Sequence, residues 1–110
     1  MKMKTQQLIR VLNECKDTCV YCANACLGEP KVSHMVDCIR TDTVCATICG
    51  ATASVLSVTN ANYAPLLEYC ITVCENCADE CEKHNHEHCQ LCARNCRACA
   101  EACRNYLKAG

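Results

Sequence analysis

The cysteines of this chain are spaced with the period of an α-helix. Sixteen of the 110 residues are cysteine, and within four groups they follow one another at steps of three, four or seven residues. Such steps return to the same face of a helix, so each group predicts one helix with a stripe of thiols. The groups are Cys15, Cys19, Cys22 and Cys26; Cys38, Cys45 and Cys49; Cys70, Cys74, Cys77 and Cys81; and Cys89, Cys92, Cys96, Cys99 and Cys103.

The residues between the groups carry signals for helix ends. The segment 27–33 contains a glycine and a proline that end the first helix, and Ser33 can cap the second through its hydroxyl. Asn60 and Asn62 are candidate caps of the third helix, and Pro65 suits a first turn, where its missing N–H costs little. Alternating apolar and polar runs that would indicate strands are absent from the sequence. We therefore predict helices over residues 3–27, 33–57, 63–83 and 87–108.

Four helices with short connections favour an all-α fold, an antiparallel up-down-up-down four-helix bundle with a cysteine-lined core. The length suits one domain over residues 1–110. In this topology the loops after the first and third helices lie at one end, which we call the mouth. There the outermost thiols meet further candidate metal ligands, namely His34, Met35, His84, His86 and His88. The opposite end gathers an apolar plug, made of Leu8, Leu12, Leu56, Tyr63, Leu66, Leu67, Tyr106 and Leu107.

The composition narrows the classes of partner. The formal net charge is −1 with acidic and basic residues interspersed, which argues against a nucleic-acid partner. The sequence has no window of eighteen apolar residues, so a membrane span is not predicted. Its first residues, MKMKTQQLIRVLNEC, lack the apolar run of a secretory signal and, taken as the native start, predict a cytoplasmic protein. In a reducing compartment, abundant cysteine indicates metal or redox chemistry instead of a disulfide scaffold.

Several uses of the thiols can be weighed against one another. A buried cysteine can act as a small hydrophobe, but sixteen in register exceed what a core requires. Cysteines at i, i+3 or i, i+4 on one helix rarely reach disulfide geometry. The run of cysteines typical of iron–sulfur proteins is absent. CVYC, CENC, CQLC and CRAC match C-x-x-C, yet they are interior parts of longer stripes with no strands nearby. A dithiol redox enzyme and a zinc or cadmium buffer stay open as alternatives.

Charge favours monovalent copper over zinc. Four zinc ions would carry +8 against −16 for sixteen thiolates, and a net charge of −8 in the core is prohibitive. Cu(I) is soft and prefers thiolate and thioether ligands. If each ion takes two thiolates and each thiolate bridges two ions, the core is nearly neutral and holds on the order of 12–18 ions. The sequence thus predicts storage of multiple Cu(I) ions and no catalytic residue. Loading should release protons, because most thiols are protonated near neutral pH.

The pattern resembles the bacterial copper storage proteins, four-helix bundles whose cores hold many Cu(I) ions on cysteines. The resemblance covers nearly the whole chain, through CKDTCVYCANAC, CIRTDTVCATIC, CITVCENCADEC and CQLCARNCRACAEAC. The family has an exported and a leaderless cytosolic form, and this start is similar to the cytosolic one. The resemblance implies a homotetramer of bundles, with the sixteen cysteines as core ligands and copper entering at one end past histidine and methionine. A copper chaperone or a small thiol is the expected donor of the copper.

The candidate ligands at the mouth differ in their relation to the stripes. Met35 precedes Cys38 by three residues and lies on the stripe, so we rank Met35 and His34 above His84, His86 and His88 as metal ligands. His86 is expected to face solvent in the loop. His88 precedes Cys89 by one residue, so its side chain is expected to point off the stripe.

Asp42 stands where the spacing of the second helix predicts a thiol. One interpretation is a carboxylate turned aside near the mouth, hydrogen-bonded or solvated. The other is a hard metal ligand or a proton acceptor beside the copper path. In both cases Asp42 interrupts the thiolate lining.

Overall fold

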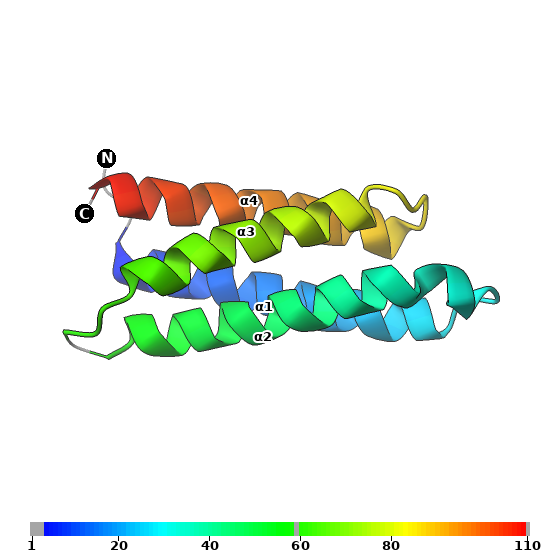
Figure 1. Cartoon of the computed structure of the whole chain (residues 1–110), viewed down its shortest axis with the longest axis horizontal. Coiled ribbons are helices and arrows are strands. Elements are labelled where there is room, and N and C mark those ends of the chain that lie inside the picture. Colours follow the sequence, from blue (N-terminus) through cyan, green and yellow to red (C-terminus); the bar gives the residue numbers. More distant parts are fainter. Residues whose placement is uncertain (1–3, 59, 110) are drawn as a thin grey trace.

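The computed structural model describes residues 4–58 and 60–109, and most of these residues are helical (Figure 1). In every long helix the buried residues recur at helical spacing. The described ranges contain no strand, which confirms the all-α prediction. A single turn of 3-10 helix, η1, precedes the second long helix. The elements are α1 (Thr5–Leu27), η1 (Val32–Met35), α2 (Val36–Leu56), α3 (Ala64–Cys81) and α4 (Glu87–Ala109).

The four long helices form the predicted up-down-up-down bundle. Each helix packs against the next along the chain, and α4 packs against α1, which closes the ring. In the described part of the chain, the backbones of the diagonal pairs do not approach one another as those of neighbouring helices do. Side chains of α2 and α4 nevertheless meet in the core, where Sγ of Cys45 lies 3.9 Å from Sγ of Cys96. The bundle measures 46 × 23 × 19 Å, and the α1–α2 and α3–α4 connections lie together at one end, as Figure 1 shows. The α2–α3 connection and both chain ends lie at the other end.

The helix boundaries depart from prediction at the caps. Ser33 does not cap α2, because the chain enters this helix through η1 and neither η1 nor α2 has a side-chain cap. Asn60 and Asn62 do not cap α3, whose N-cap residue is Tyr63. Asn60 instead adopts a φ of 66°, a left-handed conformation that asparagine tolerates. Pro65 lies in the first turn as predicted.

Helix boundaries also shift by one to three residues, and these shifts include the end of α2 at Leu56 and the start of α3 at Ala64, each one residue from its predicted place. The second α-helix begins at Val36 instead of residue 33, and α3 ends at Cys81 instead of residue 83, where the chain turns through short backbone bonds from Lys83 and His84. The last helix continues to Ala109. The first helix starts at Thr5, and residue 3, its predicted start, lies outside the described residues.

The end opposite the mouth is an apolar plug, as predicted, although Leu66, which the prediction included, is only partly buried and does not belong to the core cluster. The side chains of Leu8, Leu12 and Leu67 are 0% exposed. The rings of Tyr63 and Tyr106 meet edge to face with centroids 5.5 Å apart, and the Tyr106 hydroxyl lies 2.7 Å from that of Thr5. Burial of this kind stabilises a domain by about 1.5–3 kcal/mol for each large apolar side chain, so the plug anchors one half of the bundle.

The outer faces of the helices carry charged residues together with some exposed apolar side chains, among them Val20, Tyr21 and Tyr69. Arg97 on α4 lies 2.6 Å from Asp79 of α3 and 2.7 Å from Glu82, just beyond the end of α3, and these ion pairs link the two helices. None of the described helices combines the length with the apolar character that crossing a membrane requires.

Candidate metal site

The thiols fill the bundle interior between the plug and the mouth. All sixteen cysteines lie in the described part of the chain, are free, and are at most 1% exposed. On α1 the buried residues form one continuous stripe that passes from leucine to cysteine, namely Leu8, Leu12, Cys15, Cys19, Cys22 and Cys26. The predicted cysteine-lined core is therefore confirmed.

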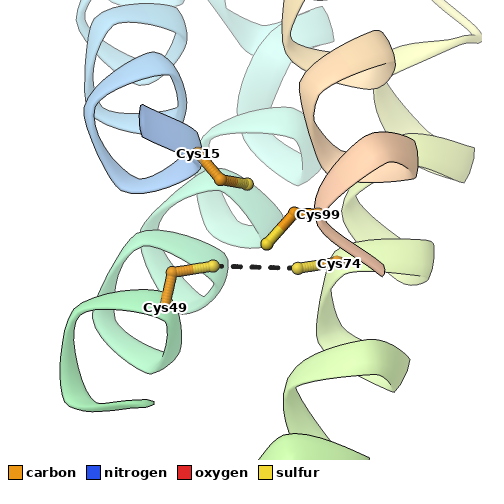
Figure 2. Close-up of side chains that lie close together, drawn as sticks. All are labelled: Cys15, Cys49, Cys74 and Cys99. Atoms are coloured by element: carbon orange, nitrogen blue, oxygen red, sulfur yellow. Dashed lines mark hydrogen bonds between the residues drawn. The ribbon is translucent and has the colours of Figure 1, made fainter. Parts of the chain in front are cut away.

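The sulfur atoms approach one another both within and between helices. Sγ of Cys22 lies 4.0 Å from Sγ of Cys26 one turn later, and Sγ of Cys38 on α2 lies 3.5 Å from Sγ of Cys81 on α3. These separations are about twice the length of a disulfide bond, so the thiols are neighbours without being bonded. Figure 2 shows a group in which Cys15, Cys49, Cys74 and Cys99 come from four different helices, with 3.7 Å between Cys49 and Cys74.

Groups of this kind overlap along the bundle. In each group the ligand atoms of four residues lie within 4.8 Å of one another, and each group shares one or two residues with the next. From the mouth inward, five of these groups are Cys22, Cys26, Cys38 and Cys89; Cys22, Asp42, Cys81 and Cys92; Cys19, Cys77, Cys92 and Cys96; Cys15, Cys19, Cys45 and Cys96; and Cys15, Cys49, Cys74 and Cys99. The donor atoms thus form a continuous chain that can hold several ions in neighbouring positions.

Asp42 belongs to this chain of donor atoms. Its side chain is 0% exposed, and Oδ1 accepts hydrogen bonds from the thiols of Cys77 and Cys92 at 3.2 Å and of Cys81 at 3.5 Å. The carboxylate is not turned aside or solvated as the first interpretation expected, because α2 carries position 42 on the same buried face as Cys38 and Cys45. The hydrogen bonding that this interpretation also named is present. Burial, followed by the nearby charges of Cys92 and Cys77, raises the pKa of Asp42 far above its usual range.

His88 faces the outermost thiols. Its Nδ1 lies 3.4 Å from Sγ of Cys22, 3.5 Å from Sγ of Cys89 and 4.0 Å from Sγ of Cys26, and its side chain is 12% exposed. The expectation that His88 points off the stripe is wrong. This residue lies in the first turn of α4, and its Nε2 is held 2.8 Å from a carboxylate oxygen of Glu29, which turns the ring inward.

The hydrogen bond between His88 and Cys22, the nearest thiol, affects the pKa of both groups. Burial alone would lower the pKa of His88, but hydrogen bonds with Cys22 and Glu29 outweigh it and leave the pKa raised. Hydrogen bonds with Cys38 and Cys81, and a weaker one with His88, lower the pKa of Cys22 to about 6. By contrast, burial raises the pKa of Cys26 and Cys89. The mouth therefore combines one thiol that ionises readily with neighbours that stay protonated.

The other mouth residues surround a hollow of about 480 Å³ that His34, Met35, His84 and His86 help to line. Met35 is 2% exposed and belongs to the core, whereas His34 is exposed. His84 lies 2.9 Å from Glu80, and His86 lies 3.5 Å from Glu29. His88 contacts the outermost thiols, whereas His34 is exposed, so their predicted ranking is reversed. The sequence did not identify Glu29 as a functional residue. Its one signal there is that it is the only acidic residue in the first loop at the mouth.

The comparisons with known proteins agree with this geometry. A family described as copper storage protein matches residues 1–108. A cytosolic copper storage protein from Streptomyces lividans, whose solved structure concerns copper loading with five coppers, is 44% identical to this chain in sequence. The match covers 96% of this chain and 92% of the relative's chain, and the two structures superpose with a TM-score of 0.91. The Cu(I)-bound copper storage protein BsCsp3 is 36% identical over 91% of this chain and 94% of its own, with a TM-score of 0.86. The uncharacterized cysteine-rich protein YhjQ of Bacillus subtilis is 35% identical over 94 residues, or 86% of this chain and 87% of its own.

Proposed function

The chain belongs to the copper storage protein family, and we propose that it stores multiple Cu(I) ions on the cysteine thiolates of its core. The observation that carries this proposal is the continuous series of overlapping four-residue groups, in which sulfur from four helices converges inside a buried core. Bridging thiolates balance monovalent ions nearly one to one, so many ions can be held without a large buried charge. The role is sequestration without catalytic turnover.

We assign the sixteen cysteines as the storage ligands and His88 as the ligand that meets incoming copper at the mouth. The approach of His88 Nδ1 to the thiols of Cys22 and Cys89 supports this role. Met35, which is buried at the same end, contributes a soft thioether, and His34, His84 and His86 line the approach. We assign Asp42 to the lining as an oxygen ligand among Cys77, Cys81 and Cys92.

We further propose that the protein acts in the cytoplasm as a homotetramer and receives its copper from a copper chaperone or a small thiol. The cytosolic description of the Streptomyces lividans relative supports the location. Exposed apolar side chains support self-association, since Val20, Tyr21 and Tyr69 are each more than half exposed. Sedimentation velocity of the metal-free protein tests the assembly, and a monomer would contradict it.

Anaerobic titration of the reduced protein with Cu(I), against a strong competing chelator, tests the storage function. We expect uptake to continue to on the order of 12–18 equivalents per chain. Saturation at one or two equivalents would refute storage and favour a dithiol redox enzyme. A parallel titration with Zn²⁺ and Cd²⁺ tests the buffering alternative, which requires those ions to compete with Cu(I) for the same thiolates.

A further inference from the structure

Glu29 joins the two loops that form the mouth. Its Oε2 lies 2.8 Å from Nε2 of His88 and 3.5 Å from Nδ1 of His86. The two imidazole rings stack with their centroids 5.4 Å apart and their planes at 4°. Glu29 follows α1, whereas His86 and His88 lie at the start of α4, so this contact connects segments 59 residues apart. The side chains of Glu29 and His88 are 22% and 12% exposed, which shields the pair partly from water.

The hydrogen bond determines which nitrogen of His88 is free to bind a metal. An ionised carboxylate can only accept, so Nε2 must carry the proton that is shared with Glu29. In the neutral ring, Nδ1 then keeps its lone pair, and in the charged ring Nδ1 carries the one proton that an incoming Cu(I) ion has to displace. This nitrogen faces the thiols of Cys22, Cys89 and Cys26 at 3.4, 3.5 and 4.0 Å. The free nitrogen and the outermost sulfurs therefore lie around a common position.

We propose that Glu29 is a positioning residue for copper uptake, whose carboxylate holds the His88 ring with Nδ1 directed at the outermost thiols. Carboxylates that accept a hydrogen bond from a metal-binding histidine fix both its tautomer and its orientation. The stacked ring of His86 covers His88 and limits its rotation. The inference rests on the proposed storage function, because it gives Glu29 a role in the entry of the first ion and none in the number of ions held.

If Glu29 were itself a metal ligand, it would need different side-chain properties from those that positioning His88 requires. A ligand role requires the negative charge, whereas a positioning role requires a hydrogen-bond acceptor at the reach of a glutamate side chain. Glu29→Gln keeps the reach and an acceptor oxygen but loses the charge. Glu29→Asp keeps the charge but is one methylene shorter, and Glu29→Ala loses both. The order of these three variants separates the two roles.

Glu80 offers a matched control. It pairs with Nε2 of His84 at 2.9 Å, in the same arrangement as Glu29 with His88 and at the same end of the bundle. Both side chains of this control pair are 15% exposed. His84 lines the hollow at the mouth but makes no hydrogen bond to a thiol within the described residues, so Glu80→Gln and Glu80→Ala perturb a glutamate–histidine pair that does not reach the outermost thiols.

Two measurements test the proposal. The first follows the Nε2 proton of His88 in the metal-free protein by ¹⁵N-histidine NMR, where a hydrogen-bonded ring proton exchanges slowly with solvent. The second is anaerobic stopped-flow absorbance of the first equivalent of Cu(I), delivered from a weak chelator. We expect Glu29→Ala to lose the proton signal and to take up this equivalent about tenfold more slowly, as is typical when a residue that orients a ligand is removed. Glu29→Gln should restore both properties, Glu29→Asp should resemble Glu29→Ala, and the Glu80 variants should match the wild type.

Two results would overturn the proposal that Glu29 positions His88. A slowly exchanging proton and a wild-type rate in Glu29→Ala would show that Glu29 does not position His88. A wild-type rate in Glu29→Asp with a slow Glu29→Gln would show that charge or direct ligation is what matters. Failure of the storage function is distinguishable, since it appears as a low Cu(I) capacity of the wild type. Helical circular dichroism of each variant, with rescue by glutamine, separates these effects from misfolding.

Discussion

Replacing Asp42 by asparagine tests whether the buried carboxyl is neutral in the folded, metal-free protein. Burial and the neighbouring thiols raise the pKa of Asp42 far above its usual range, whereas the pKa returns to about 3.9 in the unfolded chain. Between these two pKa values the folded state binds more protons than the unfolded state. The stability contributed by this group is therefore fully present below about pH 4 and is lost progressively as the pH rises.

The magnitude follows from the interval between the unfolded pKa and the pH of the measurement. Each pH unit corresponds to about 1.4 kcal/mol, so between pH 4 and pH 7 the wild type should lose about 4 kcal/mol of unfolding free energy relative to Asp42→Asn. Asparagine keeps an acceptor oxygen at position 42, so the hydrogen bonds from Cys77 and Cys92 to Oδ1 are available in both proteins. Their contribution therefore cancels in the comparison of the two pH values, which isolates the titration.

Urea unfolding followed by helical circular dichroism measures this difference in the reduced protein with a metal chelator present. Asp37→Asn is the matched control on the same helix, because the Asp37 side chain is 73% exposed. We expect the control to show little pH-dependent difference from the wild type. A difference between Asp42→Asn and the wild type that stays constant from pH 4 to pH 7 would refute the reasoning, since it would mean that Asp42 ionises normally in the fold.

Two further substitutions test the division of the bundle into a thiol half and an apolar plug. Asp42→Cys completes the four-three-four spacing of α2 and should raise the Cu(I) capacity in anaerobic titration by about one ion; an unchanged capacity would place position 42 outside the metal chain. Leu12→Ala removes a side chain that is 0% exposed and should lower the unfolding free energy of the metal-free protein by about 2–5 kcal/mol, measured in urea, while the Cu(I) capacity stays the same. A matching loss of capacity would contradict the division.

The stripes could be predicted because helical periodicity acts over many residues at once. Cys70, Cys74, Cys77 and Cys81 repeat the spacing of the first group, and no other regular structure brings all of them to one face. The caps could not be predicted with the same success. Ser33 and Asn60 have suitable side chains, but the backbone between η1 and α2 and before α3 follows the packing of the helices and leaves those side chains unused.

At the mouth, the sequence indicates which residues gather but not how their side chains turn. His88 was expected off the stripe because α-helical geometry assigns it a direction one residue away from Cys89. A single contact with Glu29, 59 residues earlier in the chain, determines the ring orientation instead. Asp42 illustrates the same limit, since its position on the stripe could be read from the spacing while the approach of Cys77 and Cys92 depends on α3 and α4.

The arrangement also bears on whether the protein folds before it binds copper. A chain that depends on metal for folding uses the binding free energy to order its backbone, and its sites do not exist beforehand. Here the apolar plug, in which Leu8, Leu12 and Leu67 are fully buried, packs the helices together at one end of the bundle without metal. Buried thiols add to this as small hydrophobes. We therefore expect the metal-free protein to give the circular dichroism of a helical bundle, and copper to enter preformed groups of thiols. A disordered metal-free chain would show instead that copper, and not the plug, holds the four helices together.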